Sequence, residues 1–168
     1  MVVTSAEANK ELRRYNDELN RLLINERQSA LFVASTTEDV ETARPEYFFA
    51  DMQEKIEGLQ KQIRTIKHAI NQFNVTHCPD GFDMTVDEML VYIPQLTAAK
   101  SKYQTMVNHL PKSRKENGLN RSAIIEYEYA NYDIELARAK LDEVTTELAR
   151  AQIALDRLNT SVTFEIQF

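Results

Sequence analysis

The stretch that decides the fold is residues 45–74, which read PEYFFADMQEKIEGLQKQIRTIKHAINQFN. Its apolar side chains recur at alternating steps of three and four without a miss: Phe49, Met52, Ile56, Leu59, Ile63, Ile66, Ile70 and Phe73. Such a repeat keeps one apolar seam of a helix facing a partner helix, which is the coiled-coil pattern. Because Pro45 suits a first helical turn, the sequence predicts a long helix over about residues 46–73.

Three further helices are predicted around this one. A second unbroken seam predicts a helix over about residues 131–159, through Ala130, Ile134, Ala137, Leu141, Val144, Leu148, Ala151, Leu155 and Leu158. Two capping boxes, Thr4 with Glu7 and Thr85 with Glu88, predict helices over about residues 5–28 and 86–110. Pro94 interrupts the last of these, and the sequence leaves open whether it kinks that helix or begins it.

Composition supports a helical fold class. The chain has 168 residues with only 3 Gly and 4 Pro, too few for an all-β or loop-rich architecture. A hydrophobic content of 43% and a net charge of -6 argue against a disordered chain. We therefore expect one all-α domain over residues 1–168, folded as an antiparallel up-down four-helix bundle.

Short β segments are expected near residues 31–35, 124–129 and 162–168, where apolar residues alternate or cluster without charge. In an up-down bundle the first two segments share one end and could pair. The tail, with Val162, Phe164, Ile166 and Phe168 on one face, lies at the other end, near only Val2 and Val3 of its own chain. A partner chain could complete it. The tail and the two seams together predict a homo-oligomer, with the number of chains open.

Charge and targeting signals favour a cytoplasmic protein without membrane contact. Residues 1–10 contain no apolar signal-peptide core, and the longest uncharged apolar stretch, residues 89–99, is far shorter than the roughly 20 residues that span a bilayer. A single cysteine cannot form an internal disulfide. Nucleic-acid binding is not expected overall, because Asp and Glu outnumber Lys and Arg by 26 to 20.

One segment is locally basic. Residues 111–121 hold Lys112, Arg114, Lys115 and Arg121 against the single acid Glu116, whereas residues 74–88 hold four acids and no Lys or Arg. We interpret the four basic residues as a candidate contact for an anion or a partner. An end-to-end contact between molecules is conceivable, although solvated loops are the ordinary explanation.

No metal or cofactor site is predicted. A di-metal bundle needs Glu-x-x-His pairs, but Thr65 precedes His68 and Met106 precedes His109 at that spacing. The loop with His77, Cys78, Asp80 and Asp83 could bind zinc or calcium, yet its spacing matches no specific site.

No catalytic residue is predicted either. Cys78 and His77 lack a third group to orient them as nucleophile and base. Tyr127, Tyr129 and Tyr132 could stack on a ligand, although alternation with Glu more simply marks one face of a strand.

The chain resembles a septicolysin-like family of small bacterial helical proteins. The resemblance rests on the motif AINQFN at residues 69–74, on Gly81 followed by TVDEML at residues 85–90, and on Tyr132-Asp133-Ile134 before a helix that closes at Leu158-Asn159-Thr160. It implies a helical, coiled-coil-like protein. The family label hints at a cytolysin, but the chain shows no secretion signal, and packing explains its heptad faces better than membrane insertion does.

The functional expectation is a non-enzymatic, self-associating cytoplasmic scaffold or protein-interaction module. The alternative is a bundle that binds a small molecule or metal and could be enzymatic, with a site near the Pro94 kink or the His77–Asp83 loop. A third hypothesis is nucleic-acid binding by residues 112–121.

Overall fold

The structure is a computed structural model that describes residues 1–115 and 125–168. Within them the chain is mostly helical with short antiparallel strands, as predicted. In chain order the elements are β1 (Val2–Thr4), α1 (Ser5–Ser29), α2 (Val40–Ala43), α3 (Phe49–Thr76), α4 (Val86–Val107), β2 (Lys112–Arg114), β3 (Tyr127–Tyr129), α5 (Ile134–Ser161) and β4 (Thr163–Glu165).

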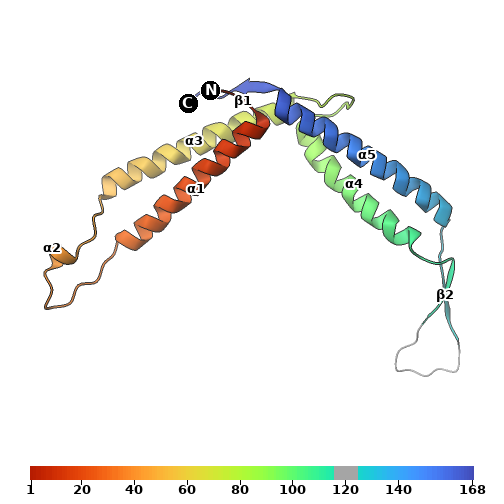
Figure 1. Cartoon of the computed structure of the whole chain (residues 1–168), viewed down its shortest axis with the longest axis horizontal. Helices are drawn as coiled ribbons and strands as arrows, with labels where there is room; N and C mark the ends of the chain where they lie inside the picture. The colour runs from red at the N-terminus through yellow and green to blue at the C-terminus, as the bar shows by residue number, and fades with distance from the viewer. Residues whose placement is uncertain (116–124) are drawn as a thin grey trace. The chain divides into compact units, whose positions relative to one another are not determined.

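The contacts divide the chain into two units. The first unit contains Met1–His77 and Arg157–Phe168, and the second unit contains Cys78–Asp156. Each unit holds an adjacent pair of long helices: α1 beside α3 in the first, and α4 beside α5 in the second (Figure 1). The four predicted helices are therefore present, and they form two such pairs.

Both predicted capping boxes are confirmed. The Glu7 N–H donates to the Thr4 hydroxyl at 3.3 Å, and the Thr4 N–H donates to the Glu7 carboxylate at 2.8 Å. Thr85 and Glu88 repeat the arrangement at 3.3 and 2.7 Å, so α4 begins there. Each box satisfies two backbone N–H groups that the first turn of a helix leaves free.

The structure places both prolines. Pro94 is inside α4, so of the two alternatives that the sequence leaves open, a helix that begins at Pro94 is excluded: the capping box nine residues earlier starts α4. Pro45 precedes α3 instead of occupying its first turn, since α3 begins at Phe49. Residues 40–43 form the short helix α2, capped by the Asp39 carboxylate.

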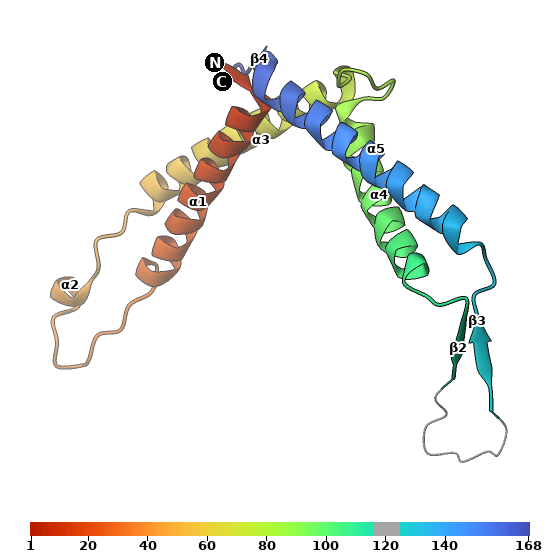
Figure 2. The ribbon, with the colours of Figure 1, turned by 45° about the vertical axis from the view of Figure 1, so that its right-hand side comes forward.

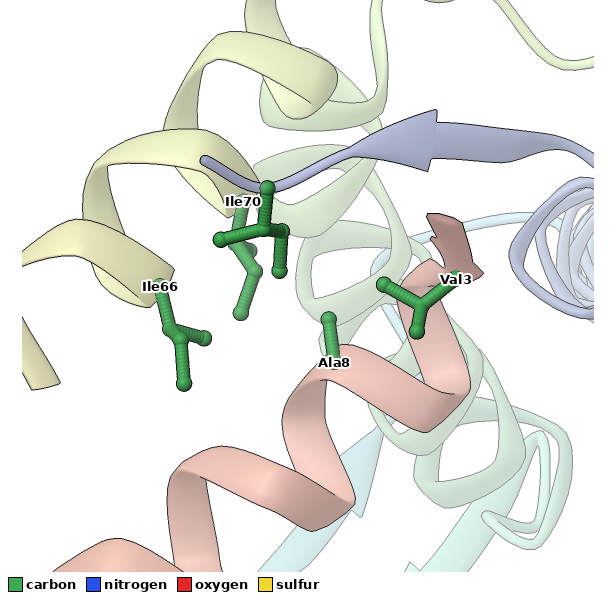
Figure 3. Packing of buried hydrophobic residues seen from close by; sticks show 5 residues of the cluster. Val3, Ala8, Ile66 and Ile70 are labelled. Carbon is green, nitrogen blue, oxygen red and sulfur yellow. The ribbon is translucent and has the colours of Figure 1, made fainter. Parts of the chain in front are cut away.

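The first unit is built on the seam of α3. Its buried residues are all members of the predicted repeat: Ile56, Leu59, Ile63, Ile66, Ile70 and Phe73. Near the chain termini, Val3 and Ala8 pack with Ile66 and Ile70 in one cluster that also contains Ile166 (Figure 3). Full burial of one such side chain contributes about 1.5–3 kcal/mol.

The C-terminal tail is covered by its own chain. Strand β4 pairs antiparallel with β1, placing Val3 opposite Phe164, and Ile166 is 1% exposed. The Phe164 ring lies 4.9 Å from that of Phe73. The expectation that a partner chain completes the tail is therefore wrong, because Val2–Thr4 supply the missing strand.

The other predicted strand pairing is also wrong. Residues 31–35 form no strand, and Leu31 and Val33 are 86% and 95% exposed. Strand β3 pairs instead with β2, from the basic segment just before it in sequence. Closing that short loop costs less chain entropy than joining residues some ninety positions apart. Ile124 lies outside the described residues.

In the second unit, α4 and α5 lie side by side (Figure 2). Two hydrogen bonds join them: Tyr92 in the second turn of α4 donates to Glu147 in the middle of α5, and Tyr132, just before α5, donates to the Met106 carbonyl in the last turn of α4. The Asp133 carboxylate caps α5 by accepting from two backbone N–H groups at 2.8 and 3.2 Å. The buried residues of α5 in this unit all belong to its predicted seam: Ala137, Leu148, Ala151 and Leu155. On α4 the buried residues are Val86, Met89 and Leu96.

Candidate interaction surfaces of the second unit

The β2–β3 hairpin carries a surface that we call the cation–aromatic face, made of Lys112, Arg114, Tyr127 and Tyr129. Lys112 pairs with Tyr129, and Arg114 pairs with Tyr127. Opposed residues in an antiparallel pair share a face, and so do residues two positions apart, so these four side chains lie on the same side. The Lys112 ammonium lies 4.1 and 5.3 Å from the Tyr127 and Tyr129 ring centroids.

This face is open to solvent. Tyr127 and Tyr129 are 47% and 60% exposed. Beyond the strand, Lys115 donates its N–H to the Glu126 carbonyl at 3.0 Å and lies 3.8 Å from the Glu126 carboxylate. In the sequence the basic residues and the tyrosines are separate features. The pairing of β2 with β3 brings them together on one face. Arg121, the fourth predicted basic residue, lies outside the described residues.

A cleft of about 450 Å³ lies at the base of the hairpin. It is lined by Asn108, His109, Leu110, Ser113, Glu128, Tyr129, Ala130, Asn131 and Tyr132. Its lining contains carboxylate, amide, hydroxyl and imidazole groups, which suit hydrogen bonding to a small polar molecule.

A relay of hydrogen bonds fixes the histidine of this cleft. Tyr132 OH donates to the Met106 carbonyl at 2.8 Å, and His109 Nδ1 lies 2.8 Å from the same hydroxyl oxygen. Since the hydroxyl proton is committed to Met106, Nδ1 must carry a proton and donate it to Tyr132. In the neutral ring Nε2 is then the acceptor. Sequence reasoning missed this pair, because nothing in the local spacing links residues 109 and 132.

A second hollow, which we call the α4 groove, has a volume of about 370 Å³ and follows the first turns of α4. It is lined by Met84, Asp87, Glu88, Val91, Tyr92 and Gln95. These positions recur at steps of one and three, which places them on one face of a helix. The groove thus combines apolar side chains with two carboxylates.

Hydrogen bonds and burial within the second unit shift the pKa values of ionisable groups in and next to the groove. The backbone N–H and hydroxyl of Thr85 hold the pKa of Glu88 below its usual range. In the groove lining, burial and then Glu147 raise the pKa of Tyr92, and hydrogen bonds from Arg150 lower the pKa of Glu147. Glu88 and Glu147 are therefore ionised at neutral pH.

Arg150 ties this end of α5 to the preceding loop. It donates to Glu147 at 2.9 Å and to the Gly81 carbonyl at 3.2 Å, and its guanidinium lies 4.2 Å from the Phe82 ring centroid. Gly81 has a φ of +78°, a conformation that glycine adopts without strain. The loop that the sequence offered as a metal site is thus anchored by an arginine 69 residues away.

The residues of the predicted His77–Asp83 site have structural contacts. The His77 ring stacks on Phe73 with centroids 4.2 Å apart, and its Nδ1 lies 3.0 Å from the Phe73 carbonyl. Cys78 is exposed, whereas Pro79 is fully buried. Among residues 1–115 and 125–168, no three His, Cys, Asp or Glu side chains are grouped to hold a metal ion. Pro94 is not among the residues that line the α4 groove, which ends at Gln95.

Comparison with known proteins found a solved structure with a similar fold. A crystal structure of a functionally unknown conserved protein from Corynebacterium diphtheriae has a TM-score of 0.58 to this chain, with 22% sequence identity over 98% of this chain and 100% of that one. At that identity the likeness concerns the fold alone. No protein-family model and no curated protein matches the chain. In the part of the chain that the structure describes, no helix combines the length and apolar character needed to cross a bilayer.

Proposed function

We propose that this protein is a non-enzymatic, self-associating interaction module of the cytoplasm. The observation that carries the proposal is the apolar surface left outside the buried seam of the second unit. Leu90 and Val91 on α4 and Leu136 and Ile153 on α5 are 51–62% exposed. Burial of these side chains against a partner would stabilise an assembly by roughly 25 cal/mol per Å² of apolar surface removed from water.

The heptad seams add support, since seams of this kind also join helices of different chains. Assembly of the two helix pairs into one antiparallel four-helix bundle belongs to the same proposal, because it too would cover apolar faces. Membership of the septicolysin-like family stays a prediction.

Sedimentation equilibrium of the full chain tests this function. We expect a mass above that of the monomer, 19.4 kDa, at micromolar concentration. A strict monomer across that range would contradict self-association.

A second candidate, a small-molecule-binding protein, is favoured by the cleft that holds His109. The ring presents Nε2 as an acceptor beside amide and carboxylate side chains. Thermal-shift measurements against polar metabolites test it, because a ligand that binds only the folded state raises Tm. Native chain and His109→Ala should then differ in their response.

A further inference from the structure

Two surfaces of the second unit carry charges of opposite sign beside apolar or aromatic side chains. The cation–aromatic face offers Lys112 and Arg114 beside two exposed tyrosine rings. The α4 groove offers Asp87 and Glu88 beside Met84 and Val91. Arginine and aromatic side chains are the groups that most often anchor protein interfaces, and a guanidinium pairs well with a carboxylate.

The two surfaces cannot meet within one copy of the second unit. The groove begins before the first residue of α4, and the hairpin follows the last (Figure 2). α4 has 22 residues and is therefore about 33 Å long. A complement to either surface would therefore come from outside this unit, and another molecule of the same chain carries one.

We propose that the cation–aromatic face of one molecule docks into the α4 groove of a second copy. This inference rests on the proposed function, since it names the partner and the contact of self-association. A contact between two different surfaces is heterologous, so it generates a ring or an open chain of molecules. Its charged pairs make the association salt-sensitive.

Charge-reversed variants of the full chain test the contact. We expect K112E/R114E and D87K each to lower the association constant at least tenfold, measured by sedimentation velocity at low salt. An equimolar mixture of the two should regain association, because the native cation–aromatic face of D87K meets the native groove of K112E/R114E, and the two reversed surfaces are oppositely charged as well. Circular dichroism melts establish that each variant is folded.

Matched controls separate the contact from general charge effects. D83K makes the same charge change as D87K on an exposed residue outside the groove lining, and K61E places a negative charge on an exposed position of α3. Both should associate like the unaltered chain.

Three results would overturn the inference. Variants that associate as strongly as the unaltered chain would leave self-association standing but move its contact elsewhere. A monomeric unaltered chain would overturn the proposed function as well. Binding of a single-stranded oligonucleotide that depends on Lys112 and Arg114, with no effect of either on association, would assign the face to nucleic acid.

Discussion

Met1 and Ile166 exchange backbone hydrogen bonds: the Met1 ammonium donates to the Ile166 carbonyl at 2.7 Å, and the Ile166 N–H donates to the Met1 carbonyl at 2.8 Å. They extend the β1–β4 ladder beyond Val2 and Glu165 and place Ile166 in the core of the first unit. The two ends of the chain thereby stabilise each other.

Ile166→Ala should therefore destabilise the protein by about 2–5 kcal/mol, because it removes buried methyl groups and leaves a cavity. Urea unfolding followed by circular dichroism measures the change. Phe168→Ala is the matched control, since Phe168 is 60% exposed and its loss should cost far less. Equal effects of the two substitutions would contradict the packing of the tail.

Pro94→Ala should stabilise the helix α4. Proline in a helix interior costs about 3 kcal/mol relative to alanine, because it lacks an N–H and crowds the preceding turn. Pro94 is exposed, so alanine leaves no core cavity. The expected result is a higher Tm. An unchanged or lower Tm would mean that Pro94 fits a distorted helix that alanine does not relax.

Acid should weaken the start of α4. The pKa of Glu88 is lower in the folded chain than the value of about 4.3 expected when unfolded, so its contribution is present above that value and is lost as pH falls through the folded pKa. Glu88→Gln removes the titrating group while it keeps a side chain that can cap. Melting curves from neutral to acid pH should fall more steeply for the native chain than for this variant. Parallel curves would contradict the capping geometry.

Tyr132→Phe should release the imidazole of His109. Loss of the hydroxyl leaves the Met106 carbonyl and Nδ1 without their shared partner, at a cost of about 0.5–1.5 kcal/mol, the net value of an ordinary hydrogen bond, because His109 is exposed to water. Nitrogen NMR of the ring reports the tautomer. We expect Nδ1–H in the native chain and a tautomer mixture in the variant. A mixture already in the native chain would contradict the relay.

The features that could be predicted from the sequence are those that depend on residues close together in the chain. Heptad steps place the seam of α3, and Thr-x-x-Glu motifs place the first residues of α1 and α4, because both depend on neighbours within one or two helical turns. Strand partners depend instead on which segments the helices bring together. That is why Tyr127–Tyr129 was predicted as a strand and paired with the wrong segment.

The candidate surfaces were predictable only in part. Lys112, Arg114 and the tyrosines were noted, but the cation–aromatic face exists only once the hairpin register is known. The residues that line the α4 groove recur regularly in the sequence. The apolar pattern that contains the buried Met89 is the stronger signal on the same helix, so the groove was not predicted. The contact of Arg150 with Gly81 spans two elements and has no local signal at all.

The most direct test of the central claim is the salt dependence of the mass of the full chain, measured by sedimentation equilibrium. Head-to-tail docking of the cation–aromatic face into the α4 groove predicts assemblies larger than the 19.4 kDa monomer at low salt that dissociate as salt rises. A mass of one chain at every concentration, or an assembly indifferent to salt, would contradict it.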